Sequence, residues 1–86
     1  MAYKVIWHAD AIEDLLNLDK NMQTKIALKI KDYLSSEPLT LGKPLLGIFK
    51  GLYRYRYGSY RIIYSVDRSD EKILILRIGH RREIYK

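Results

Sequence analysis

Three arginines stand close together in the stretch GLYRYRYGSYRIIY, which spans residues 51–64. Arg54 and Arg56 alternate with tyrosines before a Gly-Ser pair, and Arg61 follows just after that pair. Guanidinium groups stay charged and match phosphate oxygens bidentately. Residues 50–66 contain no Asp or Glu that would neutralise these charges. The stretch therefore predicts a binding site for a polyanion, either phosphate groups or an acidic partner protein.

The C-terminal segment RIGHRREIYK is a second group of cations. We expect Gly79 to end the last strand, which would deliver Arg81 and its neighbours to one edge of the sheet. Tyr85 adds an aromatic ring near the end of the chain. For His80 two readings stay open, since the side chain either reaches the bound anion or points the other way in a structural role.

Two neighbouring strands, 52–57 and 60–66, position the arginines. Gly58 in first place allows a two-residue hairpin loop, and the resulting register puts Arg56 opposite Arg61. Because successive side chains of a strand point to opposite faces of the sheet, the arginines fall on one face and the tyrosines on the other. Like charges in directly opposite positions lower stability, so this pair is not explained by a contribution to folding. We therefore expect the arginine cluster to bind a polyanion, and we expect the side chains of Arg61 and Arg81 to face solvent or a bound phosphate.

The remaining elements follow from apolar spacing and from chain breakers. Residues 3–7 predict a first strand, and helical spacing predicts a short helix near 10–18 and a longer amphipathic helix over 22–34. Residues 38–51 contain Gly and Pro breakers and read as a loop. A nearly continuous apolar strand over 73–78 is expected to be central and covered on both faces. The predicted fold is α+β, with an N-terminal strand, two helices and a three-stranded antiparallel meander, the helices packed on one face of the sheet.

Length and composition limit the class of protein. The chain has 86 residues, enough for one domain, and 48% of them are hydrophobic, which is typical of a globular fold. It contains no cysteine and no apolar run long enough to span a bilayer, so we expect a cytoplasmic protein without a thiolate metal site. We expect no cofactor and no metal. The net charge of +6 favours RNA, DNA or an acidic protein as partner.

The segment KPLLGIFKGLYRYRYGSYRIIYSV, followed by ILRIGHRREIY, resembles the RelE/ParE superfamily of bacterial and archaeal toxins, and most of all its RelE branch. The likeness covers nearly the whole chain, and GHRREIY is its most specific part. It implies a single RelE-like toxin domain over residues 1–86. It also implies a toxin of a type II toxin–antitoxin system that enters the ribosomal A site and cleaves translated mRNA without a metal. A cognate antitoxin, which we expect to be acidic, would bind it in a heteromeric complex.

The same resemblance implies roles for individual residues. It makes Arg61, Arg81 and Tyr85 catalytic. It assigns RNA or phosphate binding to Arg54 and Arg56, and the cationic C-terminal segment itself adds His80 and Arg82 to the expected RNA- or phosphate-binding residues. Metal-free RNA cleavage needs a base for the 2′-hydroxyl, cations for the transition-state charge and an acid for the leaving oxygen. A cluster of arginines favours a phenolate, so Tyr85 suits the base, while His80 or Arg81 would be the acid.

Two alternatives belong to other functional classes. ParE proteins share this fold, lack the nuclease residues and bind DNA gyrase, so the chain is alternatively a non-catalytic gyrase inhibitor. The presence of Arg61, Arg81 and Tyr85 together favours the nuclease. A simple RNA- or DNA-binding domain is the weaker hypothesis, because no standard nucleic-acid motif is visible.

Overall fold

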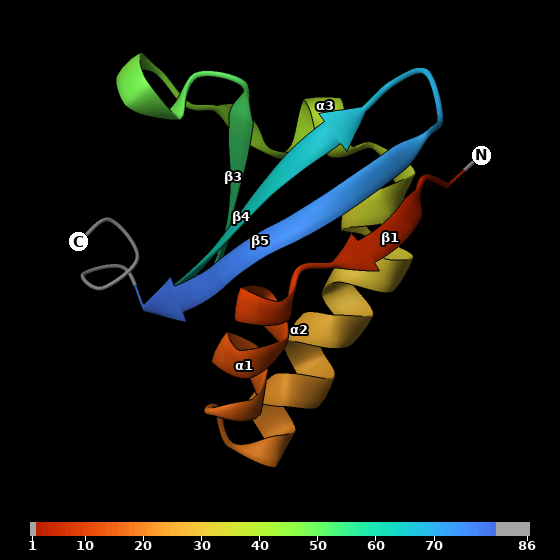
Figure 1. The fold of residues 1–86 in the computed structure, drawn as a ribbon. Coiled ribbons are helices and arrows are strands. Elements are labelled where there is room, and N and C mark those ends of the chain that lie inside the picture. Colours follow the sequence, from red (N-terminus) through yellow and green to blue (C-terminus); the bar gives the residue numbers. More distant parts are fainter. Residues whose placement is uncertain (1, 81–86) are drawn as a thin grey trace.

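The computed structural model describes residues 2–80 and shows an α+β fold (Figure 1). Its elements in chain order are β1 (Lys4–Trp7), α1 (Ala9–Leu16), α2 (Lys20–Asp32), α3 (Pro38–Leu41), β2 (Lys43–Pro44), β3 (Leu52–Tyr57), β4 (Tyr60–Asp67) and β5 (Lys72–His80). Short 3-10 turns precede α3 and precede β3. The predicted α+β order is confirmed, with one additional strand and one additional helical turn in the segment expected to be a loop.

The sheet has five strands in the order β1-β5-β4-β3-β2. The meander β3–β4–β5 is antiparallel as predicted, and β1 joins β5 in parallel. β2 pairs with β3 at the opposite edge, where Pro44 is tolerated because an edge strand can lack a ladder donor. The expectation of an uninterrupted loop over 38–51 is therefore wrong. A two-residue strand that contains Pro44 is too short to show as a period-2 pattern.

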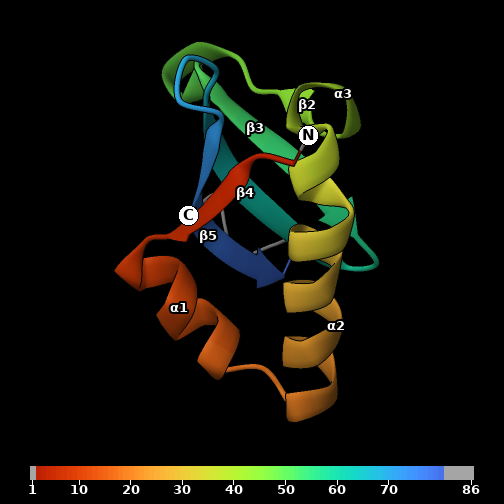
Figure 2. The ribbon, with the colours of Figure 1, turned by 90° about the vertical axis from the view of Figure 1, so that its right-hand side faces the viewer.

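Both helices cover one face of this sheet, as predicted. The buried core joins Ala11 of α1 and Ile30 of α2 to Ile62 and Tyr64 of β4. Figure 2 shows α2 lying along one side of the strands. Because side chains alternate along a strand, the residues between these core positions on β4 belong to the face that the helices do not cover.

The two long helices begin at capping side chains. His8 Nδ1 accepts a hydrogen bond from the backbone N–H of Asp10 at 3.0 Å, and Asp19 Oδ1 accepts one from Met22 at 2.8 Å. Each bond satisfies an otherwise orphaned donor in a first helical turn. His8 therefore has a local structural role in starting α1. Within residues 2–80 the helices are too short or too polar to span a membrane.

A buried tyrosine fixes the chain just before β2. The Tyr64 hydroxyl donates a 2.6 Å hydrogen bond to the carbonyl oxygen of Pro38, and the side chain is fully buried. A Cβ atom added at Gly42 would lie 1.8 Å from this hydroxyl oxygen, so only glycine fits there. The backbone between α3 and β2 is thus held closely against β4, and this contact sets where β2 enters the sheet.

Two expectations for the last strand are wrong. β5 continues through Gly79 to His80, because Gly79 still pairs with Arg61 of β4. β5 also lies between β1 and β4, so the central strand is β4, and the face of β5 away from the helices is only partly buried. The apolar run of β5 therefore reflects an interior strand, but not one covered completely on both sides.

Candidate nucleic-acid interface

The arginine pairing predicted from the hairpin is present. β3 and β4 pair in the expected register, with Arg56 opposite Arg61 and Arg54 opposite Ile63. Tyr55 and its neighbouring strand tyrosines pack against the core on the helix side. The arginines consequently lie on the face of the sheet away from the helices. We call Arg54, Arg56 and Arg61 the arginine face.

Arg61 is much less exposed than the sequence predicts. The residue is only 9% exposed, whereas Arg56 is exposed. On β4, Arg61 lies between Arg56 of β3 and Gly79 of β5. Gly79 has no side chain beside Arg61, so the long arginine side chain meets no bulky residue at the paired position of β5. Of the two surroundings expected for Arg61, open solvent is wrong, and a bound phosphate stays a prediction.

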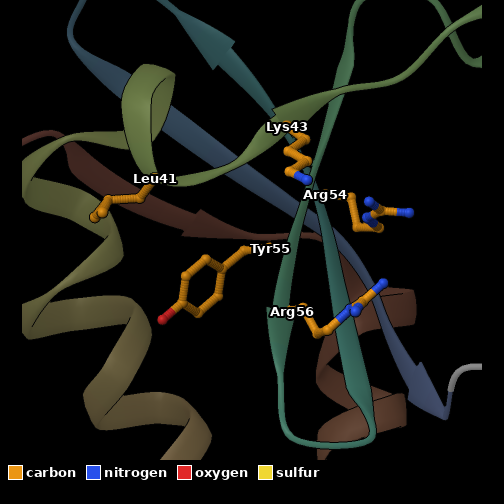
Figure 3. Close-up of a pocket in the computed structure, with 5 residues that line it drawn as sticks. All are labelled: Leu41, Lys43, Arg54, Tyr55 and Arg56. Atoms are coloured by element: carbon orange, nitrogen blue, oxygen red, sulfur yellow. The ribbon is translucent and has the colours of Figure 1, made fainter.

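A further cation joins the arginine face from β2. Lys43 pairs directly with Arg54, and both line a concavity together with Arg56, Leu41 and Tyr55. In Figure 3 the guanidinium groups of Arg54 and Arg56 lie on one side of β3, while the Tyr55 ring points to the other. Lys43 shares the face of Arg54 because the two residues are paired across β2 and β3. Sequence reasoning missed Lys43 because its segment was read as a loop. The sequence does carry one indication of its role, because the stretch without Asp or Glu extends over residues 38–66 and so includes Lys43.

The structure does not bring His80 to the arginine face. His80 pairs with Tyr60, whose ring packs against the core, and the two rings meet edge to face at a centroid distance of 5.9 Å. The neighbouring residue Gly79 is the one that faces Arg61. Of the two open readings of His80, the geometry supports the structural one. The other predicted site residues of this segment, Arg81, Arg82 and Tyr85, lie outside the described residues.

Arg77, a cation near the end of β5, is paired with a carboxylate. Arg77 Nε donates to Asp14 Oδ2 at 2.8 Å, and this hydrogen bond raises the pKa of Arg77. The same carboxylate oxygen accepts the backbone N–H of Ile78 at 2.9 Å. Asp14 thereby ties α1 to β5 beyond the last β1 pairing, at Ile75. Arg77 is engaged by this carboxylate and does not add to the arginine face.

Two tyrosines near the site are poorly suited to act as bases. Burial raises the pKa of Tyr55, helped by the charges of Tyr33 and Tyr57. Burial also raises the pKa of Tyr64, helped by Tyr53 and opposed by a hydrogen bond with the Gly42 backbone. Both phenols stay protonated at neutral pH. Across residues 2–80 no cluster of three or more His, Cys, Asp or Glu side chains could hold a metal ion.

The sequence and the fold match a known class of small toxins. The ParE toxin family of the type II toxin–antitoxin system parDE matches residues 5–85. The chain belongs to this family, within the RelE/ParE superfamily, and is a toxin of the type II toxin–antitoxin class.

Two relatives and two solved structures that share more than 30% of its residues carry Rel names. Toxin RelG of Mycobacterium tuberculosis is 35% identical over 86 residues, covering 100% of this chain and 99% of the relative. Toxin RelE of the same organism is 31% identical over 84 residues, covering 98% and 87%. The toxin–antitoxin complex RelBE2 of that organism superposes with a TM-score of 0.90 at 33% identity, covering 94% of this chain and 100% of the solved one. The archaeal RelE–RelB complex of Pyrococcus horikoshii superposes with a TM-score of 0.73 at 32% identity, covering 96% of this chain and 99% of the solved one.

Proposed function

We propose that the chain is a ribosome-dependent endoribonuclease that cleaves translated mRNA in the A site and so inhibits translation. The observation that carries the proposal is the placement of Arg61 at 9% exposure on the central strand, between Arg56 and Gly79. A guanidinium withdrawn from bulk water interacts more strongly with a phosphate than one in open solvent. The Rel toxins among the relatives support the assignment to this branch.

Each part of the proposed reaction has a candidate group. The 2′-oxygen attacks the adjacent phosphorus, the 5′-oxygen leaves, and extra negative charge develops on the phosphoryl oxygens. Arg61, with Arg54 and Arg56 beside it, would stabilise that charge. Tyr85 remains the proposed base and Arg81 the proposed acid, with Arg82 as a further RNA contact. The ribosome would supply the alignment of the 2′-oxygen for attack, an entropic contribution that is often large.

A non-catalytic toxin that inhibits DNA gyrase is the second candidate. The match to the ParE toxin family favours it, because the resemblance assigns gyrase binding to ParE proteins. Binding gyrase requires no arginine on a central strand beside a second arginine, since a protein interface can place its charges on the rim. The arginine face therefore favours the nuclease over the gyrase inhibitor.

We also propose a cognate acidic antitoxin as the cytoplasmic partner. Two of the similar solved structures are toxin–antitoxin complexes, and this chain carries a net charge of +6 with an arginine face. An acidic chain would be steered to such a surface, and the steering weakens as salt rises. Association measured by stopped flow at two salt concentrations tests this, and an association rate indifferent to salt contradicts it.

Cleavage on ribosomes distinguishes the two candidate functions. Purified toxin is added to ribosomes that hold a defined mRNA codon in the A site, and primer extension maps the mRNA ends. We expect a new end within that codon, little cleavage of the same RNA without ribosomes, and unaffected supercoiling by gyrase. Intact mRNA together with inhibited gyrase would establish the second candidate instead.

A further inference from the structure

We propose that Lys43 forms an additional phosphate-binding subsite, which continues the arginine face from β3 onto β2. Its ligand is a phosphodiester of the single-stranded substrate RNA beside the one that is cleaved. The inference rests on the proposed function, because it needs an RNA strand on the arginine face.

The register of β2 and β3 puts Lys43 beside the arginines. Lys43 lies directly opposite Arg54, and residues opposite each other on neighbouring strands project from the same face. Both side chains line the concavity that Arg56 also lines, and Figure 3 shows Lys43 extending from β2 toward β3 and Arg54. A phosphate in this concavity would lie within reach of cations from two strands.

The local charge balance is unfavourable without an anion. Lys43 is exposed, and residues 38–66 contain no Asp or Glu. Within residues 2–80, Lys43 takes part in no salt bridge, in contrast to Arg77 with Asp14. Two cations directly opposite on a sheet repel each other, as Lys43 and Arg54 do here. A bound phosphate would relieve this repulsion.

The backbone that carries Lys43 is held in place. The hydrogen bond from Tyr64 to Pro38 anchors the chain on one side of β2, and the Leu45 backbone N–H donates to the Leu52 carbonyl oxygen at 2.9 Å on the other. The close approach of Gly42 to the Tyr64 hydroxyl fixes the residue immediately before Lys43. Only the lysine side chain needs to become ordered when a phosphate binds, so the entropic cost is confined to its rotamers.

The spacing separates the role of Lys43 from that of Arg61. β2 and β4 lie on either side of β3, so the two backbones are about 10 Å apart at the usual strand spacing. An RNA strand crossing the sheet would meet Arg61 and Lys43 with different phosphates. Lys43 would therefore strengthen binding of the substrate strand, while Arg61 acts on the phosphate that reacts.

The first test measures binding of a non-cleavable, 2′-O-methylated RNA oligonucleotide at several KCl concentrations. We expect Lys43→Ala to lower the slope of log affinity against log salt by about 0.7, the value for one lost contact to a single strand. Lys43→Arg should keep the wild-type slope. The matched control is Lys50→Ala, since Lys50 is an exposed lysine of the same segment that pairs with no arginine, and its slope should not change. An unchanged slope in Lys43→Ala would overturn the subsite.

The second test is cleavage on programmed ribosomes. Lys43→Ala should raise KM and leave kcat at the wild-type value, because it removes binding that is equal in ground and transition states. A raised KM with an unchanged oligonucleotide slope would place the contact on the ribosome and overturn the assignment to the substrate strand. If the wild-type protein cleaves mRNA and Lys43→Ala changes neither KM nor kcat, the subsite is refuted but the proposed function is not. Lack of cleavage by the wild-type protein would refute both.

Discussion

Arg56 on β3 and Arg61 on β4 lie directly opposite each other, on the face of the sheet that the helices leave uncovered. Like charges in this position are destabilising. Arg56 is exposed, but Arg61 is largely withdrawn from solvent. Water and salt therefore screen the charge of Arg56 more than that of Arg61. A fold that tolerates this repulsion is consistent with a bound anion as the natural neighbour of the pair.

Replacing Arg56 by threonine should stabilise the free protein. The change removes the repulsion and introduces a β-branched residue, so we expect the free energy of unfolding to rise by about 0.2–1 kcal/mol. Urea unfolding at low and high salt measures it, and the gain should shrink at high salt because the repulsion is screened. A gain that is independent of salt would mean that strand propensity alone is responsible.

Gly42→Ala should destabilise the protein. The new methyl group would collide with the Tyr64 hydroxyl, and overpacking of this kind typically costs about 1–3 kcal/mol. Tyr64→Phe removes the oxygen atom at 1.8 Å but leaves the ring carbon at 2.8 Å, so the double variant should recover part of the loss. A double-mutant cycle by chemical unfolding tests the coupling. Strict additivity of the two substitutions would show that the residues do not contact each other.

The sequence predicts the arginine hairpin well because its signals are local. A glycine at the turn and strict alternation on both sides define β3 and the Arg56–Arg61 pairing. Three features depend on contacts between distant segments and could not be predicted: β2, the burial of Arg61, and the side of the sheet that His80 faces. Tyr64 contacts the chain at Pro38 and Gly42, just before β2 pairs at the sheet edge, and the face of His80 follows from the β4–β5 register.

Stability should fall in strongly alkaline solution. The pKa of Tyr64 is raised above the ordinary value of about 10 that it has in the unfolded chain, so above pH 10 the unfolded state releases a proton that the folded state keeps. The stabilisation is present in full below pH 10 and is lost as the pH rises toward the folded pKa. Unfolding in urea between pH 8 and about 11 measures the slope, which should be shallower in Tyr64→Phe. Equal slopes in the two proteins would exclude Tyr64 as the cause.

Asp14→Ala should cost more stability than Arg77→Ala. Both remove the same partly exposed ion pair, but only Asp14→Ala also leaves the partly buried N–H of Ile78 without its acceptor. That loss is about 1–3 kcal/mol. Thermal or urea unfolding of the two variants compares them directly. Equal costs would mean that water replaces the carboxylate at Ile78.

The most direct test of the central claim is the single-turnover rate of mRNA cleavage on programmed ribosomes by Arg61→Lys and Arg61→Ala. Arg61→Lys keeps the positive charge but loses the bidentate hydrogen bonding of the guanidinium group. It serves as a control, because Arg61→Ala could lose activity simply by disrupting the buried site. Circular dichroism checks that both variants are folded. If Arg61 stabilises the transition state, Arg61→Ala should cleave about 10²–10³-fold more slowly with unchanged ribosome affinity, and Arg61→Lys should lie between it and the wild type. A folded Arg61→Ala variant that cleaves at the wild-type rate would show that Arg61 does not stabilise the transition state.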